Sequence, residues 1–309
     1  MSRAFRFLLQ ARERLYNSGI LATVRLNHPV ISVGNLTLGG TGKTPLVIAL
    51  AEQLRDRGLH PVILSRGYRR RSREIVIAGS DWEQAGDEPC LMVRRLGSVP
   101  VVVGADRYEA GLLAERQELG NIFILDDGFQ HRRLYRDVDI VAIDPVEWAR
   151  GEALLPTGRW REPKSALERA QAACVQEIPG SPVPLLPIPT FIVRTEIQGL
   201  YESDTAVAPQ DVKGRSVIAF AGIAKPERFF AAVESLGIRP ARCISFPDHH
   251  PYSHRDIEKL RAEVLITTEK DAVRLNRRGF RNFVHLRISA KIPDFEQLMK
   301  LIFERLPKL

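Results

Sequence analysis

The feature that most constrains this chain is a glycine-rich loop between an apolar run and a helical pattern, in the segment Val30-Ile-Ser-Val-Gly-Asn-Leu-Thr-Leu-Gly-Gly-Thr-Gly-Lys-Thr-Pro45. A strand, a loop and a helix opened by Gly-Lys-Thr form the context that a phosphate-binding loop requires. Backbone N–H groups of such a loop point at phosphate oxygens, Lys43 neutralises them, and Thr44 offers a hydroxyl to Mg²⁺. The residues predicted to bind the nucleotide are Thr37, Leu38, Gly39, Gly40, Thr41, Gly42, Lys43 and Thr44.

The loop departs from the GxxxxGK[ST] pattern at Thr37, where the pattern has glycine. Gly39 and Gly40 supply flexibility within the loop. The alternative interpretation is a glycine-rich turn that only joins a strand to a helix. The strand, the glycines, the Lys-Thr pair and the helix together favour phosphate binding.

A pair of carboxylates, Asp126 and Asp127, follows another run of four apolar residues. Adjacent carboxylates repel each other unless a cation joins them, and a phosphate-binding loop needs a carboxylate at the end of a neighbouring strand for Mg²⁺. The alternative is a solvated Asp-Asp-Gly turn. We favour a metal site made by Thr44, Asp126 and Asp127, with Asp139 and Asp144 on the next strand as weaker candidates.

Short apolar runs alternate with helical patterns along most of the chain. Strands are predicted at Pro29–Val33, Pro61–Ser65, Val99–Val103, Ile122–Leu125, Ile140–Ile143, Val217–Phe220, Cys243–Phe246 and Val264–Thr267, and helices at Thr44–Arg57, Pro226–Leu236, Ser253–Ala262 and Phe295–Leu306. This alternation predicts an α/β fold with a mostly parallel sheet covered by helices. The 309 residues, 44% hydrophobic and 27% charged, exclude a disordered, collagen-like or disulfide-scaffold chain.

Five prolines in Pro179–Pro189 interrupt the alternation. Proline neither continues a helix nor sits inside a sheet, so this segment reads as a linker or edge segment. We expect a helical segment over 1–28, a core domain over 29–195 and a smaller α/β domain over 196–309.

The formal net charge of +8 implies an anionic partner, but it does not choose among nucleic acid, nucleotide, phosphorylated substrate and acidic membrane. The three cysteines are far apart, which indicates neither a zinc site nor a disulfide framework and fits a reducing compartment. No apolar run of the length that crosses a bilayer is present in the sequence.

The first 28 residues have the composition of a basic amphipathic helix. Five arginines oppose the single Glu13, and Phe5, Leu8, Leu9 and Leu15 recur at helical spacing. Such a helix can lie in the interface of an anionic bilayer. From these residues alone, a surface helix packed on its own domain is the more ordinary interpretation.

Two further segments carry candidate acid–base groups. Asp87, in Gly86-Asp-Glu-Pro89, is either a helix N-cap or a general base beside an attacking hydroxyl. His249 and His250 follow Asp248 and could be metal ligands, a base or solvated loop residues. Adjacent histidines point in different directions, so one functional histidine is favoured over a two-ligand metal site.

Basic residues gather at Ser65-Arg-Gly-Tyr-Arg-Arg-Arg71 and again at Arg159-Trp-Arg-Glu-Pro163. We assign Arg69–Arg73 to a solvated face. Arg66 and Tyr68 lie nearer the carboxyl edge of the sheet, where ligands bind in α/β folds.

Taken together, these motifs resemble the tetraacyldisaccharide 4'-kinase family of lipid A biosynthesis. The resemblance rests on SVGNLTLGGTGKTP, SRGY, GDEP, DDGFQHRRL, RDVDI, LLPTGRWREP, FAGIAKPERFF, FPDHHPY and TTEKDAVRL, in this order across almost the whole chain. The pairing of GGTGKTP with DDGxQH at this spacing is specific to the family, which also tolerates a non-glycine at Thr37. Most members have Leu in place of Phe129 and Gly-Pro-Leu in place of Gly158-Arg159-Trp160, changes that bear on fine substrate contacts.

The resemblance implies a P-loop NTPase fold of the RecA-like type, with the smaller domain closing over the active site. It implies a kinase that uses ATP and Mg²⁺ to phosphorylate the 4'-hydroxyl of a tetraacylated glucosamine disaccharide 1-phosphate. Asp87 matches the general base, His249 the histidine that works with it, and Lys43 the catalytic phosphate ligand. The residues expected to contact substrate are Arg66, Tyr68, Arg107, Gln130, His131, Arg161 and Glu162.

A lipid substrate changes the interpretation of residues 1–28, which we then expect to attach the protein to a membrane. The resemblance implies a peripheral protein on the cytoplasmic face of the bacterial inner membrane, with an anionic membrane surface as partner. No obligate protein partner and no nucleic acid are expected.

Two other classes of function compete with this interpretation. A regulatory P-loop ATPase or GTPase would act through protein contacts, but Thr268-Glu-Lys-Asp271 lacks the spacing of an Asn/Thr-Lys-x-Asp base reader. A nucleic-acid-binding module is suggested by the net charge alone, since aromatic residues are only 7% and no nucleic-acid motif is recognised.

Overall fold

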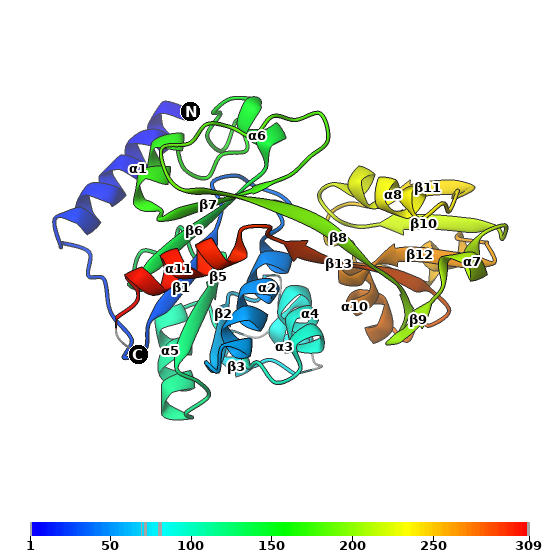
Figure 1. The fold of residues 1–309 in the computed structure, drawn as a ribbon, viewed down its shortest axis with the longest axis horizontal. Helices are drawn as coiled ribbons and strands as arrows, with labels where there is room; N and C mark the ends of the chain where they lie inside the picture. Colours follow the sequence, from blue (N-terminus) through cyan, green and yellow to red (C-terminus); the bar gives the residue numbers. More distant parts are fainter. Residues whose placement is uncertain (1, 69, 71–72, 80–81, 308–309) are drawn as a thin grey trace. The chain divides into compact units, whose positions relative to one another are not determined.

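The computed structural model describes residues 2–68, 70, 73–79 and 82–307. The run Arg69–Arg73, expected on a solvated face, lies partly outside these residues. The chain divides into unit 1, Met1–Thr195 with Ala290–Leu309, and unit 2, Glu196–Ser289 (Figure 1). The smaller domain expected over 196–309 is therefore shorter, because the chain returns to unit 1 at Ala290, and residues 1–28 belong to unit 1 as well.

Unit 1 contains a mostly parallel sheet with the strand order β8-β7-β6-β1-β5-β2-β4-β3. Its strands are β1 (Val30–Gly34), β2 (Pro61–Ser65), β3 (Val76–Ile77), β4 (Val101–Val103), β5 (Ile122–Asp126), β6 (Val138–Ile143), β7 (Ala172–Gln176) and β8 (Thr190–Glu202), of which β8 continues into unit 2. Among the described residues, the short β3 pairs antiparallel with β4, and the other strand pairs of this sheet are parallel. The expected α/β architecture is confirmed.

Helices cover both faces of this sheet, which explains why its central strands β1, β2, β5 and β6 are buried at every position and mostly apolar. The helices are α1 (Ser2–Asn17), α2 (Lys43–Asp56), α3 (Trp82–Ala85), α4 (Asp87–Leu96), α5 (Arg107–Arg116), α6 (Pro145–Ala149), the 3₁₀ turn η1 (Lys164–Arg169) and α11 (Phe295–Arg305). On one face, Ala110 and Ala114 of α5 pack with Val30, Phe123 and Leu125 of the strands. Residues on strands alternate between faces, and α2 packs on β1, β2 and β5 from the other side.

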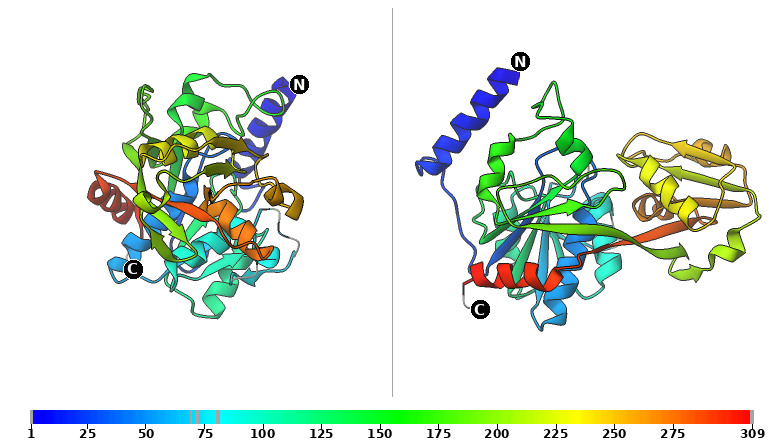
Figure 2. Two further views of the ribbon diagram at one scale, coloured as in Figure 1. Left: turned by 90° about the vertical axis from the view of Figure 1, so that its right-hand side faces the viewer. Right: turned by 45° about the horizontal axis from the view of Figure 1, so that its top comes forward.

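The C-terminal helix α11 shows why the chain returns to unit 1. Its buried side chains are Leu298, Met299 and Ile302, and Arg57 at the end of α2 forms an ion pair with Glu296 at 2.5 Å. Figure 2 shows α11 lying on unit 1 beyond the long strand that leads out of unit 2. The helix is thus part of the core domain and not of the smaller one.

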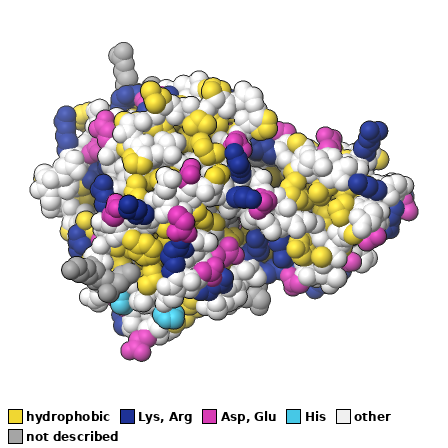
Figure 3. Space-filling view, viewed as in Figure 1, with side chains coloured by type: hydrophobic (Ala, Val, Ile, Leu, Met, Phe, Trp, Pro, Cys, Tyr) yellow, Lys and Arg dark blue, Asp and Glu magenta, His cyan; other side chains and the backbone are white. Residues whose placement is uncertain are grey.

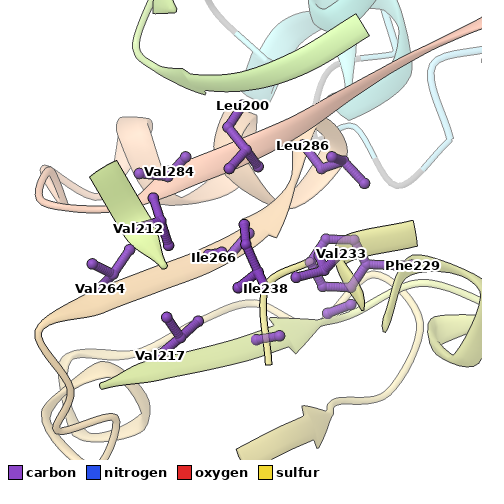
Figure 4. Packing of buried hydrophobic residues seen from close by; sticks show 12 residues of the cluster. Leu200, Val212, Val217, Phe229, Val233, Ile238, Val264, Ile266, Val284 and Leu286 are labelled. Atoms are coloured by element: carbon purple, nitrogen blue, oxygen red, sulfur yellow. The ribbon is translucent and has the colours of Figure 1, made fainter. Parts of the chain in front are cut away.

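Unit 2 has a parallel order β11-β10-β12-β13, with a β8–β9 antiparallel hairpin beside β13. Its elements are β9 (Thr205–Val207), α7 (Pro209–Val212), β10 (Val217–Ala221), α8 (Pro226–Ser235), β11 (Arg242–Ser245), α9 (His254–Glu258), β12 (Val264–Thr268), α10 (Glu269–Arg277) and β13 (Val284–Lys291). Phe229 and Val233 of α8 pack on one face of these strands (Figure 4). Ala272 and Leu275 of α10 pack on the other face, with the buried Tyr252.

Two expected segments differ from the structure. The helix expected at Ser253–Ala262 is only one short element, α9, which begins after a capping box between Ser253 and Asp256. The proline-rich segment is the loop between β7 and β8 inside unit 1 and does not link the two units. No helix in the described part of the chain is both long and apolar enough to cross a bilayer.

Candidate active site

The glycine-rich loop follows the carboxyl end of β1 and leads directly into α2. Gly42 is the N-cap of α2 with φ 78°, and a Cβ at this position would clash with the side-chain amide of Gln176. Buried Asn35 donates from Nδ2 to Thr37 O (2.6 Å) and Thr41 Oγ1 (3.1 Å), which ties the two halves of the loop together. The loop therefore has a fixed shape with the helix N-terminus behind it.

Position 37 does not require glycine, because the segment around Trp160 supports the loop at this point. Thr37 and Trp160 form an antiparallel bridge, and Leu38 N donates to Arg159 O (2.7 Å). Trp160 is buried and its ring centroid lies 5.5 Å from that of Trp148. In the Gly158-Arg159-Trp160 departure from the family pattern, Trp160 thus packs in the core behind the loop, while Arg159 is exposed.

Glycine is required where the acidic segment crosses β1. A Cβ on Gly34 would lie 2.5 Å from Phe129 Cβ and 2.7 Å from its backbone nitrogen. Phe129 is fully buried, so the larger residue at this family position fills the core of unit 1. This close approach places the two aspartates beside the phosphate loop.

Asp127 is held between two cations. Its carboxylate lies 3.4 Å from Lys43 Nζ and accepts hydrogen bonds of 2.8 and 3.0 Å from Arg161 NH1. Burial by itself raises the pKa of Asp127, but Lys43 and Arg161 outweigh burial and hold that pKa below its usual range. Its backbone has φ 51°, a left-handed conformation that aspartate tolerates better than most residues.

Asp126 has the opposite environment. It is buried and accepts a hydrogen bond from Ser65 Oγ at 2.9 Å, and the charges of Glu88 and Asp127 act on it more strongly than that of Lys43. Burial, followed by the charges of Glu88 and Asp127, raises the pKa of Asp126 to about 7. Thr44 Oγ1 donates to Glu88 Oε1 at 3.5 Å, which brings a hydroxyl into the same group.

Glu88 is a site residue that the sequence prediction did not include. It lies next to Asp87 in the first turn of α4, and the two adjacent acids after Gly86 were the available signal. The N-cap of α4 is Gly86, so the alternative interpretation of Asp87 as the cap is wrong. Asp87 is the first residue of the helix and is half-buried.

Thr44, Glu88 and Asp126 together suit a divalent cation. They offer hydroxyl and carboxylate oxygens, the ligands that Mg²⁺ prefers, and the pKa of Asp126 is raised by burial and then by the neighbouring charges of Glu88 and Asp127. No group of three acidic, histidine or cysteine side chains capable of holding a metal is found within the described residues. Mg²⁺ commonly takes one or two protein carboxylates together with phosphate oxygens and water.

Gln130 and His131 lie beside the loop. Gln130 donates from Nε2 to Asn35 O (2.9 Å), and its Oε1 accepts a hydrogen bond from Arg161 Nη1 (3.4 Å). Burial, and then Arg107 and other arginines, lower the pKa of His131 to about 4, so that its ring is neutral at physiological pH. His131 Nε2 is buried and has no hydrogen-bond partner among the described residues.

The remaining expected substrate contacts differ in exposure. Arg107 is buried, and burial followed by repulsion from Arg66 lowers its pKa to about 10. Arg66 and Tyr68 are exposed after the end of β2. Glu162 is buried and accepts a hydrogen bond from Arg169 at 2.7 Å, so its carboxylate serves an internal ion pair.

Helix α1 is attached to unit 1 by one face. Phe5 and Leu9 pack against the hydrophobic core of unit 1, and Arg12 donates to Gln130 O at 2.8 Å. Phe7 and Leu8 are exposed by 65% and 63%. Figure 3 shows hydrophobic and basic side chains next to each other on the part of unit 1 where Figure 1 places α1.

His249 lies in unit 2, in the loop after β11. It has φ 60°, and its backbone N–H donates to Gly222 O at 3.0 Å. The nearby TTEKD segment is not a base reader, because Asp271 is buried and accepts hydrogen bonds from Thr268 Oγ1 (2.8 Å) and Gly222 N (3.0 Å). Asp87 and His249 therefore belong to different units.

Comparisons with known proteins agree with this arrangement. The family model described as tetraacyldisaccharide-1-P 4'-kinase matches residues 1–307. A tetraacyldisaccharide 4'-kinase of Aquifex aeolicus is 40% identical over 304 residues, covering 96% of this chain and 94% of the relative. One of Dechloromonas aromatica is 45% identical over 256 residues, covering 80% and 75%.

A solved structure shares the fold over almost the whole chain. It is the crystal structure of "apo" form LpxK from Aquifex aeolicus in complex with ATP, with a TM-score of 0.86 and 38% identity. The match covers 99% of this chain and 97% of that one. The chain belongs to the tetraacyldisaccharide 4'-kinase family.

Proposed function

We propose that this protein transfers the γ-phosphoryl group of ATP to the 4'-hydroxyl of a tetraacylated glucosamine disaccharide 1-phosphate. The observation that carries the proposal is the phosphate-binding loop beside Asp126 and Asp127, in a chain that matches the kinase family over residues 1–307. The regulatory ATPase or GTPase alternative lacks such support, because Asp271 of the only candidate base reader is used inside unit 2.

Lys43 and the loop amides bind and orient the phosphates. Asp127 holds Lys43 at 3.4 Å and Arg161 at 2.8 Å, so two cations are positioned before any ligand arrives. Thr44, Glu88 and Asp126 would hold Mg²⁺, which when bound neutralises charge on the transferring phosphates. We therefore assign the metal to Asp126 and the orientation of the cations to Asp127.

Asp87 is the proposed general base. Transfer breaks the O–H bond of the acceptor hydroxyl and the bond between the γ-phosphorus and the bridging oxygen, forms the new O–P bond, and releases ADP. The hydroxyl proton goes to the carboxylate of Asp87, which lies in the first turn of α4. The pairing with His249 of unit 2 stays a prediction from the family resemblance.

The acidic head group of the substrate needs cationic and polar partners. Arg107 Nε and His131 Nε2 are buried polar atoms with no hydrogen-bond partner within the described residues, which supports a role in binding a ligand. Arg66 is an exposed cation close enough to lower the pKa of Arg107. We assign the phosphate of the acylated disaccharide to the cluster of Arg66, Arg107 and His131, together with Tyr68. Glu162, which is in an ion pair with Arg169, is assigned a structural role.

Helix α1 is the proposed attachment to an anionic bilayer on the cytoplasmic side of the inner membrane. A tetraacylated substrate resides in a bilayer because its chains bury many CH₂ groups there. Phe7 and Leu8 present apolar side chains outward while Phe5 and Leu9 anchor the helix. Helix α1 would thus pack on unit 1 through Phe5 and Leu9 and contact the bilayer through Phe7 and Leu8.

Replacing the base tests the catalytic assignment. Asp87→Asn should lower kcat by about 10²–10⁴-fold with little change in the KM for ATP, since proton abstraction is lost while phosphate binding remains. The measurement is steady-state transfer of labelled phosphate to the lipid acceptor in detergent micelles. Asp56→Asn, an exposed carboxylate of unit 1, is the matched control. Unchanged turnover in Asp87→Asn would remove Asp87 from the role of base.

Removing the outward side chains of α1 tests the membrane proposal. The double variant Phe7→Ser/Leu8→Ser should bind vesicles of phosphatidylethanolamine and phosphatidylglycerol about tenfold or more weakly, because two apolar side chains no longer enter the interface. Sedimentation with vesicles gives the affinity. Phe303→Ser, which removes an exposed apolar side chain of α11, should bind as the unchanged protein does. Equal vesicle binding by the unchanged protein, the double variant and Phe303→Ser would contradict attachment through α1.

A further inference from the structure

The loop between β7 and β8 presents an unusual surface to water. The loop begins with Glu177, and its other twelve residues, numbered 178–189, contain five prolines and no charged residue. Leu185 is 100% exposed and Val183 is 46% exposed. Burial of apolar area is favourable, so transfer of Leu185 and Val183 into another apolar phase would stabilise the bound state.

The inner side of the same loop is anchored. Leu186 and Ile188 are half-buried and pack against the hydrophobic cluster that also receives Phe5 and Leu9 of α1. Side chains therefore alternate along this stretch, and Leu185 lies on the outer side. The loop and α1 are attached to one part of the core of unit 1.

The prolines suit this loop to a bilayer interface. Proline has no backbone N–H, so five positions have no donor to leave unpaired when the loop leaves water. Proline also restricts the free chain, which lowers the entropy lost when the loop becomes ordered on a surface. With no charge over residues 178–189, this part of the loop depends on apolar insertion, while the arginines of α1 attract anionic lipid.

We propose that this proline-rich loop inserts Leu185 and Val183 into the bilayer that contains the acylated substrate, as a second contact beside α1. The inference rests on the proposed function, because the occupant is the membrane in which a tetraacylated substrate resides. A two-point attachment would restrict rotation of unit 1 on the surface, which a single helix does not.

A fluorescent label tests the loop separately from α1. In Leu185→Cys/Cys243→Ser, an NBD label at position 185 should become brighter and blue-shifted when phosphatidylethanolamine–phosphatidylglycerol vesicles are added. The control label is on the native Cys243, an exposed residue of unit 2, and should not change. In addition, Leu185→Asp should weaken vesicle binding about tenfold.

The possible outcomes separate the two proposals. Sedimentation of the protein with vesicles, but no change in the label at 185, would overturn loop insertion and leave α1 as the attachment. If the protein does not sediment with vesicles at all, both loop insertion and attachment through α1 are overturned. A spectral change that depends on protein concentration without vesicles would assign the loop to contact with a second copy and overturn the proposal.

An independent observation concerns the buried ion pair of unit 2. Arg274 NH1 donates to Asp271 Oδ1 at 2.7 Å and to Gly222 O at 3.0 Å. Arg274 NH2 lies 3.1 Å from His249 Nδ1. Asp271 and Arg274 are on α10, which follows the carboxyl end of β12, and Gly222 follows the carboxyl end of β10; the loop that carries His249 follows β11.

The chemistry of arginine determines the tautomer of this histidine. A guanidinium group has only donors, so His249 Nδ1 must accept, and the proton of the neutral ring is on Nε2. The backbone N–H of His249 is fixed as well, by Gly222 O at 3.0 Å. Both the ring and the loop are thus held by one buried network.

We infer that Arg274 is a positioning residue that presents His249 as a hydrogen-bond donor through Nε2. This deepens the proposed function by separating the two roles: Asp87 accepts the proton of the sugar hydroxyl, and His249 donates to an anionic acceptor. In this tautomer Nε2 already has its proton, so His249 is not the proton acceptor.

Nitrogen NMR of the ¹⁵N-histidine-labelled protein tests the tautomer without substrate. At neutral pH, the His249 signals, assigned by comparison with His249→Gln, should show an unprotonated Nδ1 and a protonated Nε2. Arg274→Met should shift the tautomer balance and lower kcat by about 10–100-fold with an unchanged KM for ATP, because small displacements at a reacting centre cost this much. Arg274→Lys, which keeps a hydrogen-bond donor, should restore part of the tautomer balance and part of kcat.

A protonated Nδ1 in the unchanged protein would overturn the inference. So would a folded Arg274→Met protein with the original tautomer and turnover. If that variant does not fold, the spectrum of the unchanged protein decides alone. A correct tautomer in a protein that phosphorylates no lipid would instead contradict the proposed function and leave the role of Arg274 in place.

Discussion

Repulsion between the adjacent carboxylates Asp126 and Asp127 is the constraint on which the candidate site depends. The structure gives them different surroundings, with Lys43 and Arg161 around Asp127 and with Ser65 and Glu88 around Asp126. One carboxylate has a pKa held below its usual range by two cations, whereas the pKa of the other is raised to about 7 by burial and by the charges of Glu88 and Asp127. In the proposed function, the first orients the cations that bind phosphate and the second binds the metal.

Local sequence predicted the parts of the fold that short-range chemistry determines. The phosphate loop, the strand before it and the aspartate pair follow from patterns within about fifteen residues, as in other phosphate-binding loops. The support of Thr37 by Trp160 could not be read in this way, because the two residues are 123 positions apart in the numbering and meet only through tertiary pairing. The return of α11 to unit 1 was missed for the same reason.

Site residues show the same limit. Glu88 was next to a predicted residue, but only the fold brings it to Thr44 and Asp126. Glu162 matched a family motif, yet its carboxylate is in an ion pair with Arg169. The TTEKD segment was set aside as a base reader, and the structure gives it a different task, since Asp271 fixes the guanidinium beside His249.

The net charge of +8 now has a physical distribution. Some of it lies in the candidate site, through Lys43, Arg107 and Arg161, where we propose that it binds phosphate, and some of it lies on α1, where apolar side chains also face outward. Both uses follow from a substrate that is at once a phosphate and a lipid.

Transfer of ³²P from γ-labelled ATP to a tetraacyl disaccharide 1-phosphate in detergent micelles tests the account most directly. The account predicts labelled lipid with the new phosphate at the 4' position, formation that requires Mg²⁺, and loss of the product in Asp87→Asn. Hydrolysis of ATP at equal rates with and without the lipid, and no labelled lipid, would contradict it.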